Sequence, residues 1–150
     1  MIASNDAGAE IVTHSLGSCL AVVVYDPGPR LGALLHVMLP DSTINPAKAQ
    51  ASPYMFVDTG VPRLFRAVCG LGANRSRLVV KVVGGAQFLN DNCMFNIGER
   101  NFQTLVPLLA KNGYAIHARD VGGKISRTVR LDMPTGKVTI QSPGLPPYSL

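Results

Sequence analysis

Three side chains in the first quarter of the chain have the types needed for nucleophilic catalysis. Thr13 and Cys19 lie in "THSLGSCLAVVVYD", and His36 lies in "GALLHVMLP". A thiol becomes a nucleophile when a neighbouring base removes its proton, and imidazole is the side chain best suited to this near neutral pH. A hydroxyl that hydrogen-bonds the other ring nitrogen can orient the imidazole. The set predicts attack on a carbonyl carbon, provided that the fold brings the three groups together.

The turn before Cys19 adds a second feature. Leu16, Gly17 and Ser18 form a tight turn that would expose the backbone N–H groups of Ser18 and Cys19 beside the sulfur. Such donors can lower the pKa of a thiol, and they can also hold a developing oxyanion. A single cysteine is more often a small buried apolar residue. Catalysis by Cys19 therefore requires a base within reach.

The chain has three histidines that could serve as this base: His14, His36 and His117. His14 is separated from Cys19 by the tight turn and can face either side. His117 alternates with apolar residues in "YAIHARD", which is typical of a surface histidine or of one hydrogen-bonded within a strand. His36 lies in an apolar strand, where the alternative to a catalytic base is a core histidine bonded to backbone.

Hairpin geometry favours His36. Residues 20–25 and 31–39 are predicted to be strands joined by the turn "DPGPR",. A fold-back in the middle of that turn pairs positions whose numbers sum to about 56, which sets Cys19 opposite a neighbour of His36. We therefore expect Cys19 and His36 to lie together, with Thr13 close enough to hydrogen-bond one ring nitrogen.

The remaining elements indicate the fold class. Apolar positions recur at helical spacing in residues 54–70 and 102–110,. Further strands are expected at residues 78–83, 114–119, 125–131 and 137–141. Strands gather at both ends of the chain with the helices between them. The sequence thus predicts an α+β fold, a sandwich of mixed β-sheet with two longer helices.

Length and composition suit a single domain. The 150 residues are 47% hydrophobic and 15% charged, which excludes intrinsic disorder,. One domain spanning residues 1–150 is expected, with loose termini at residues 1–9 and 142–150. Residues 39–53, rich in Pro, Ser, Asn and Ala, are expected to form a loop,.

Composition also limits the partners and the location. The net charge is +5, yet the basic residues are dispersed and are not interleaved with aromatic ones, so no nucleic-acid partner is expected,. The apolar runs are much shorter than the ~20 residues of a membrane span, so no membrane insertion is expected. The N-terminus lacks the pattern of a signal peptide, and the odd count of cysteines favours free thiols. These features predict a cytoplasmic protein.

Other motifs are interpreted structurally. With three histidines and no Cys-x-x-Cys, the chain is expected to bind no metal, and no other cofactor is implied,. "VVGGAQF" and "DVGGK" lack phosphate-loop spacing, so they are interpreted as tight turns or as backbone approaching the Cys19 site. In "FNIGERN", Asn96 and Glu99 either cap the following helix or contact a substrate, and the cap is favoured.

The residues and their spacing resemble the chemoreceptor glutamine deamidase family, CheD. Thr13, "LGSC" ending at Cys19, and His36 before "LP" match its pattern in order and spacing. Further family-like segments are "YMFVDTGVP", "KVVGGAQF", "FNIGERN" and "DVGGKISRTVRLDMPTG". The resemblance covers residues 11–138. It implies a fold like that of other α+β cysteine hydrolases, with Cys19 as nucleophile, His36 as general base and acid, and Thr13 as the residue that orients the ring.

The resemblance also implies an activity and partners. CheD proteins hydrolyse glutamine side-chain amides on methyl-accepting chemoreceptors, producing glutamate and ammonia. They also bind the phosphatase CheC, which connects them to the response regulator CheY. The alternative is a non-catalytic module that docks to CheC and to receptors. The intact set of Thr13, Cys19 and His36 favours the enzyme, because a degenerate copy would be expected to lose one member.

Overall fold

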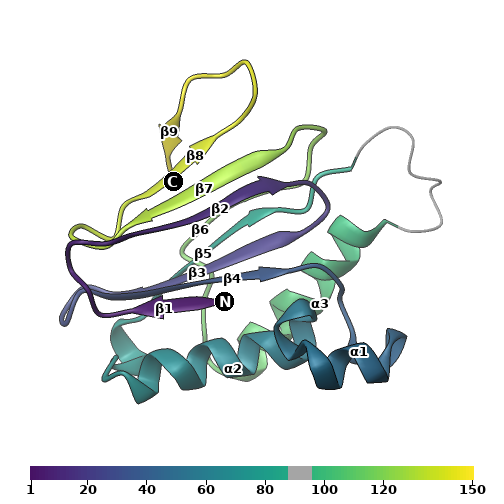
Figure 1. Ribbon diagram of the computed structural model, residues 1–150, viewed down its shortest axis with the longest axis horizontal. Helices are drawn as coiled ribbons and strands as arrows, with labels where there is room; N and C mark the ends of the chain where they lie inside the picture. Colours follow the sequence, from purple (N-terminus) through teal and green to yellow (C-terminus); the bar gives the residue numbers. More distant parts are fainter. Residues whose placement is uncertain (88–95) are drawn as a thin grey trace.

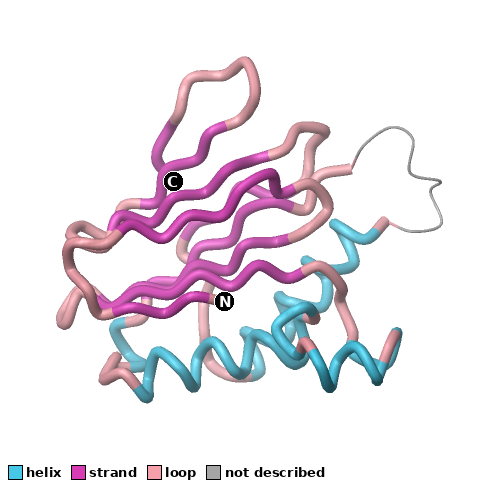
Figure 2. The backbone as a smooth tube through the Cα atoms, viewed as in Figure 1, coloured by secondary structure: helices cyan, strands magenta, loops and turns pink. Residues whose placement is uncertain are grey.

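The computed structural model describes residues 1–87 and 96–150, which form three stacked layers (Figure 1). The five-stranded sheet has the order β1 (Ile2–Ser4), β4 (Leu31–Val37), β3 (Leu20–Asp26), β5 (Val79–Gly84) and β6 (Ala118–Val121). The four-stranded sheet has the order β2 (Glu10–Leu16), β7 (Arg127–Asp132), β8 (Val138–Gln141) and β9 (Tyr148–Ser149). Helices cover one face of the first sheet, and the second sheet covers the other (Figure 2).

The sandwich of mixed sheet that the sequence predicts is confirmed. β5 and β6 run parallel, while the other neighbours in both sheets are antiparallel. The helices are α1 (Pro46–Ala51), α2 (Val57–Gly70) and α3 (Ile97–Lys111), with 3-10 turns η1 (Ser42–Ile44), η2 (Pro53–Met55) and η3 (Arg75–Arg77). The two longer helices are the two predicted. None of the described helices is long and apolar enough to cross a membrane.

The β3–β4 hairpin forms the centre of the first sheet. Its register pairs Leu20 with Val37 and Asp26 with Leu31, as an antiparallel hairpin across "DPGPR". The β3 residues that pack toward the helices are Leu20, Val22 and Val24, and those that pack toward the second sheet are Ala21, Val23 and Tyr25. Because both faces of β3 are covered, the strand is a continuous apolar run rather than an alternating one.

The loop expected at residues 39–53 contains a helix instead. Asn45 caps α1, since its side-chain oxygen accepts the N–H of Lys48 at 2.9 Å. Pro46 occupies the first helical position, where its fixed φ favours the helix and its missing N–H costs nothing. The helix is only six residues long. It is therefore too short for apolar periodicity to reveal it.

The expectation of loose termini was wrong as well. β1 pairs with β4, where Ile2 lies opposite Leu34. β9 pairs with β8, where Tyr148 lies opposite Ile140. Each end of the chain thus adds an edge strand, which gives its backbone N–H and C=O groups partners in a sheet.

Candidate active site

Cys19 and His36 lie on the same face of the five-stranded sheet. The register pairs Ala21 with His36 and Leu20 with Val37. Side chains two residues apart on a strand share a face, so Cys19, directly before β3, faces the same side as Ala21 and is a diagonal neighbour of His36. Cys19 packs against the apolar cluster between the two sheets. The observed register is shifted by one residue from the predicted one.

Thr13 reaches His36 from the other sheet. It lies on β2 opposite Val129, which is buried between the sheets. Thr13 Oγ1 is 2.9 Å from Nδ1 of His36, and this hydrogen bond crosses the interface between the sheets. The two sheets supply the hydroxyl and the imidazole separately, so the packing of one sheet on the other determines this contact.

An irregularity in β2 lets the strand lead into the site. The pairing of β2 with β7 is interrupted between Thr13 and Leu16. Ser15 has a φ of 53°, in the left-handed region that few residues other than glycine adopt,. In a regular strand Leu16, three positions after Thr13, would point to the opposite face. Because of the irregularity Leu16 is instead fully buried, while His14 and Ser15 are exposed,. The chain then crosses to the first sheet through the turn that ends at Cys19.

The second ring nitrogen of His36 is available as a base. Nε2 is buried and has no hydrogen-bond partner within the described ranges 1–87 and 96–150, so the Cys19 thiol is not bonded to it in this state. If Nδ1 carries the proton and donates it to Thr13 Oγ1, then Nε2 carries a lone pair. Catalytic hydrogen bonds are often long in the absence of substrate and tighten in the complex.

One glycine-rich turn, Gly84–Gly85, supports the turn that carries Cys19. The N–H of Gly85 donates to the carbonyl of Cys19, and the N–H of Ala86 donates to that of Gly17, both at 2.8 Å. Gly84 has a φ of 117°, and a Cβ atom there would lie 2.3 Å from the Cys19 carbonyl oxygen. The interpretation of "VVGGAQF" as backbone close to the Cys19 site is confirmed up to Gln87, since its last residue, Phe88, lies outside the described residues.

The turn that ends at Cys19 carries the two amides expected to form an oxyanion hole, those of Ser18 and Cys19. Among the residues that the structure describes, neither Ser18 nor Cys19 donates its backbone N–H to a carbonyl of a turn or loop. Backbone N–H groups next to a nucleophile can stabilise negative charge on the oxygen of an attacked carbonyl. Their role in catalysis stays a prediction.

Burial determines the protonation states of the pair. It raises the pKa of the Cys19 thiol above its ordinary value, and a hydrogen bond from the Cys19 backbone N–H opposes this less strongly. Burial also lowers the pKa of the His36 imidazole. The lowering of the thiol pKa that the turn was expected to cause is therefore outweighed. Both shifts favour the neutral thiol and the neutral imidazole over an ion pair,.

The other two histidines are placed elsewhere. His14 is exposed on β2, next to Thr13 but on the opposite side of the strand,. His117 is exposed and lies directly before β6, and its Nδ1 accepts the backbone N–H of Val80 at 3.1 Å, so of the two alternatives that the sequence left open it is the surface histidine. In the part of the chain that the structure describes, no three His, Cys, Asp or Glu side chains converge to hold a metal ion.

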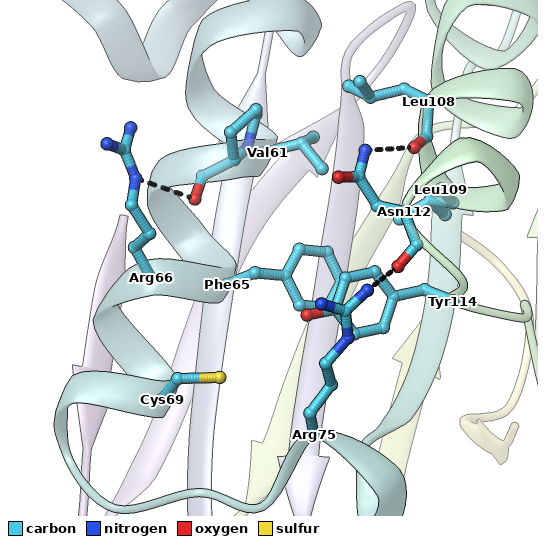
Figure 3. Close-up of a pocket in the computed structure, with 10 residues that line it drawn as sticks. Val61, Phe65, Arg66, Cys69, Arg75, Leu108, Leu109, Asn112 and Tyr114 are labelled. Atoms are coloured by element: carbon cyan, nitrogen blue, oxygen red, sulfur yellow. Dashed lines mark hydrogen bonds between the residues drawn. The ribbon is translucent and has the colours of Figure 1, made fainter.

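A separate hollow contains a second cysteine. Cys69 lies on α2 and lines a hollow between α2 and α3, which is also lined by the stacked rings of Phe65 and Tyr114, whose centroids are 3.8 Å apart (Figure 3). Neither Cys19 nor His36 lines this hollow. Both Cys19 and Cys69 are free thiols. Cys93, the third cysteine, and Phe95 of "FNIGERN" lie outside the described residues.

Sequence reasoning missed Asn101. Its side chain is fully buried, and its amide donates to two carbonyl oxygens close to Cys19 and His36. The available signal was periodicity, because Gly98, Asn101, Leu105 and Leu109 form the buried side of α3,. A polar residue on that side needs hydrogen-bond partners. The predicted cap is confirmed nearby, where the Asn96 side chain accepts the N–H of Glu99 at 3.3 Å.

Comparison with known proteins identifies the family. A family model described as CheD chemotactic sensory transduction matches residues 38–142. The chain belongs to the CheD family. This confirms the resemblance noted in its sequence. The matched range includes the Gly84–Gly85 turn and Asn101 but begins just after His36.

Curated CheD relatives extend the match toward the N-terminus. The probable chemoreceptor glutamine deamidase CheD 1 of Syntrophus aciditrophicus is 47% identical over 95% of this chain and 89% of its own length. The probable chemoreceptor glutamine deamidase CheD of Solibacter usitatus is 46% identical over 89% of the chain and 79% of its own length. The probable chemoreceptor glutamine deamidase CheD of Methanococcus vannielii is 39% identical over 84% of the chain and 80% of its own length. The first alignment leaves out so little of the chain that it includes the positions of Thr13, Cys19 and His36.

Proposed function

We propose that this CheD-family protein is a cysteine-dependent amidohydrolase that converts glutamine side chains of chemoreceptors to glutamate. The observation that carries the proposal is the hydrogen bond between Thr13 and His36, beside a thiol on the same face of the sheet. The substrate class rests on relatives that are named probable chemoreceptor glutamine deamidases. Cys19 is the nucleophile, His36 the general base and acid, and Thr13 the residue that orients the imidazole.

In the first half of the reaction, Cys19 Sγ attacks the δ-carbonyl carbon of the glutamine. His36 Nε2 takes the thiol proton as the C–S bond forms, since the neutral pair favours proton transfer during attack over a preformed thiolate,. The carbonyl oxygen becomes an oxyanion and accepts hydrogen bonds from the backbone N–H groups of Ser18 and Cys19. When the intermediate collapses, the C–N bond breaks, and the imidazolium gives its proton to the leaving ammonia.

In the second half, water hydrolyses the thioester. His36 Nε2 takes a proton from the water as its oxygen attacks the same carbon. The C–S bond then breaks, the imidazolium returns its proton to the departing sulfur of Cys19, and the glutamate side chain is released. Thr13 keeps the ring in one tautomer through both halves, because its hydroxyl oxygen can accept the Nδ1–H of both the neutral and the charged imidazole.

Mass spectrometry of a receptor cytoplasmic fragment incubated with the protein tests the proposal. The wild-type protein is expected to convert specific glutamines to glutamates, while Cys19→Ala and His36→Ala are inactive. Cys69→Ala is the matched control, since it removes a thiol outside the site and should retain full activity. Normal deamidation by Cys19→Ala would reject the assignment.

A protein that only docks to its partners is the second candidate. A docking module has no need for a base beside the thiol, so its Cys19 should react with a thiol reagent at the same rate with and without His36. An enzyme should lose reactivity in His36→Ala. We also propose that the protein binds a CheC-type phosphatase, as its family resemblance implies, and titration calorimetry of the two purified proteins tests this.

A further inference from the structure

We propose that Asn101 is a positioning residue, which fixes the turn that carries Cys19 relative to the strand that carries His36. The inference rests on the proposed function, since it assigns Asn101 a role in that same site. Asn101 lies on α3, in the helical layer, and it contacts neither ring nitrogen of His36 by a hydrogen bond. Its effect on the reaction therefore has to pass through the backbone that it holds.

The side chain of Asn101 bridges the two segments of the site. Nδ2 donates to the carbonyl oxygen of Ser18 at 3.2 Å and to that of Met38 at 3.1 Å. Ser18 directly precedes Cys19 in the chain, and Met38 follows His36 by two residues. One amide group thus joins the backbone next to the nucleophile to the backbone next to the base.

The bridge lies where strand pairing can no longer hold these segments. The last β3–β4 pair is Leu20 with Val37. Beyond it the chain after β4 turns away from β3, because the N–H groups of Met38 and Leu39 both donate to the carbonyl of Met55. Cys19 lies just outside the ladder, so its distance from His36 is not set by ladder hydrogen bonds. The amide of Asn101 supplies the missing connection.

α3 holds this amide in a fixed place. Gly98, one turn before Asn101, packs so closely on the Gly84–Gly85 turn that a Cβ atom would lie 2.5 Å from the carbonyl oxygen of Gly85. Leu105, one turn after, is fully buried in the core between helices and sheet. The helix is therefore anchored on both sides of Asn101. A rigid support of this kind keeps reacting groups aligned.

Burial of Asn101 destabilises the folded protein, which indicates that its N–H₂ group has a role,. The residue is fully buried, and its Oδ1 has no hydrogen-bond partner in the ranges 1–87 and 96–150. A buried acceptor without a partner is destabilising. An apolar residue of similar shape would remove that penalty, but it would also leave the carbonyls of Ser18 and Met38 without their shared donor.

The test measures how fast iodoacetamide alkylates Cys19 near neutral pH, together with deamidation of a receptor fragment. All proteins carry Cys69→Ser, and peptide mass spectrometry separates Cys19 from Cys93. Four versions are compared: the parent, Asn101→Leu, His36→Ala and the double variant. Asn112→Leu is the matched control, because Asn112 also donates its side-chain amide to a carbonyl, that of Leu108, at the far end of α3.

If Asn101 positions the pair, Asn101→Leu lowers kcat by about 10²-fold while KM changes little, because a small displacement of reacting groups is enough for such a loss. It also slows alkylation of Cys19 in folded protein, and adding it to His36→Ala slows alkylation no further, since the two changes break the same arrangement. Asn112→Leu leaves both rates unchanged.

Additive effects of Asn101→Leu and His36→Ala on alkylation would overturn the proposal, and so would a parental rate in Asn101→Leu. If Asn101→Leu does not fold, Asn101→Ala gives the same comparison without added volume. The proposed function fails separately, if Cys19→Ala still deamidates the receptor fragment. A wild-type kcat in Asn101→Leu with inactive Cys19→Ala would reject the role of Asn101 alone.

Discussion

Thr13 and His36 meet across the interface of the two sheets, with Oγ1 of the threonine 2.9 Å from Nδ1 of the histidine. The imidazole is half-buried, and its other nitrogen faces no partner among the described residues. A hydroxyl has no charge with which to stabilise an imidazolium, unlike the carboxylate of a Ser-His-Asp triad. Its contribution is therefore orientation of the ring and choice of tautomer.

Removal of this hydroxyl should slow the reaction moderately. Thr13→Val keeps the shape of the side chain but cannot accept the Nδ1–H, so we expect kcat to fall about tenfold, the equivalent of one ordinary hydrogen bond. Thr13→Ser keeps the hydroxyl and should retain most of the activity. Steady-state kinetics on a receptor fragment measures both. A loss in Thr13→Ser together with full activity in Thr13→Val would mean that the methyl group, rather than the hydroxyl, matters.

The pH dependence of the reaction should reflect a base with a low pKa. Burial lowers the pKa of His36, so the acid limb of kcat/KM should have its midpoint below about 6.5, the ordinary value for histidine,. As the pH falls through that midpoint, His36 becomes protonated and cannot accept the thiol proton. Activity is thus expected to fall toward acid pH and to be constant through neutral pH. Kinetics measured over about two pH units on either side of that ordinary value would show this.

Alkylation of Cys19 provides the complementary measurement. Burial raises the pKa of the thiol, so its reaction with iodoacetamide should keep accelerating above about pH 8.5, the ordinary value for cysteine. A rate that is already at its maximum in mild acid would contradict this expectation. Such a rate would mean that Cys19 and His36 form a thiolate–imidazolium pair in the free protein.

The sequence predicts the Cys19–His36 part of the site because both residues belong to one local hairpin. Counting back across "DPGPR" placed them within one residue of the observed register. Thr13 is different, since its contact with His36 joins two sheets. The path of the chain from β2 to the first sheet depends on the irregularity at Ser15. Serine has no preference for a positive φ, so the sequence does not predict this irregularity.

Features that depend on tertiary packing could not be predicted. Burial of Cys19 outweighs the turn amides in setting its pKa, and burial is a property of the packed sheets. The apolar periodicity of α3 could predict that Asn101 is buried. It could not predict its partners Ser18 and Met38, because they are far away in sequence. Short pieces such as α1, and edge strands at both termini, leave too few residues for a periodic signal.

The conformation of Gly84 should be required for a stable site. Its φ is 117°, and a Cβ atom would lie 2.3 Å from the carbonyl oxygen of Cys19. Gly84→Ala therefore combines backbone strain of about 1–3 kcal/mol with a collision against backbone. Gly72 is the matched control, since its φ is 103° and a Cβ atom there would meet nothing within 4 Å. Urea unfolding should show a larger loss of stability for Gly84→Ala than for Gly72→Ala.

The activity of the same two variants distinguishes an effect of the Gly84 turn on the site from a general loss of stability. Gly84→Ala pushes on the carbonyl of Cys19, so deamidation by the folded protein should fall as well. Gly72→Ala strains a turn after α2, outside the site, and should leave the specific activity of the folded fraction unchanged. Equal losses of stability, together with wild-type activity in Gly84→Ala, would contradict the close approach of this turn to Cys19.

Arg127 should stabilise the fold far more than the neighbouring Arg130. Nε and Nη2 of Arg127 each donate to a carboxylate oxygen of Asp120 at 2.8 Å, and only 7% of the arginine side chain is exposed. Arg130 pairs with Glu10 at the same distance, but both side chains are at least 39% exposed. Arg127→Met is expected to cost about 3 kcal/mol, because it leaves a partly buried carboxylate unpaired. Arg130→Met is expected to cost less than about 1 kcal/mol.

The stabilisation by the Arg127–Asp120 pair should depend on pH. Burial opposes ionisation of Asp120, but hydrogen bonds from Arg127 and Tyr148 outweigh it and lower the pKa of the carboxyl. A carboxyl with a lowered pKa in the folded state stabilises above its ordinary value of about 3.9, and this contribution is lost as the pH falls through the folded value. The difference in unfolding free energy between wild type and Arg127→Met, measured by urea at several pH values, should therefore shrink below about pH 4. A difference independent of pH would mean that Arg127 stabilises through packing and its bonds to the carbonyls of Gly122 and Ile125.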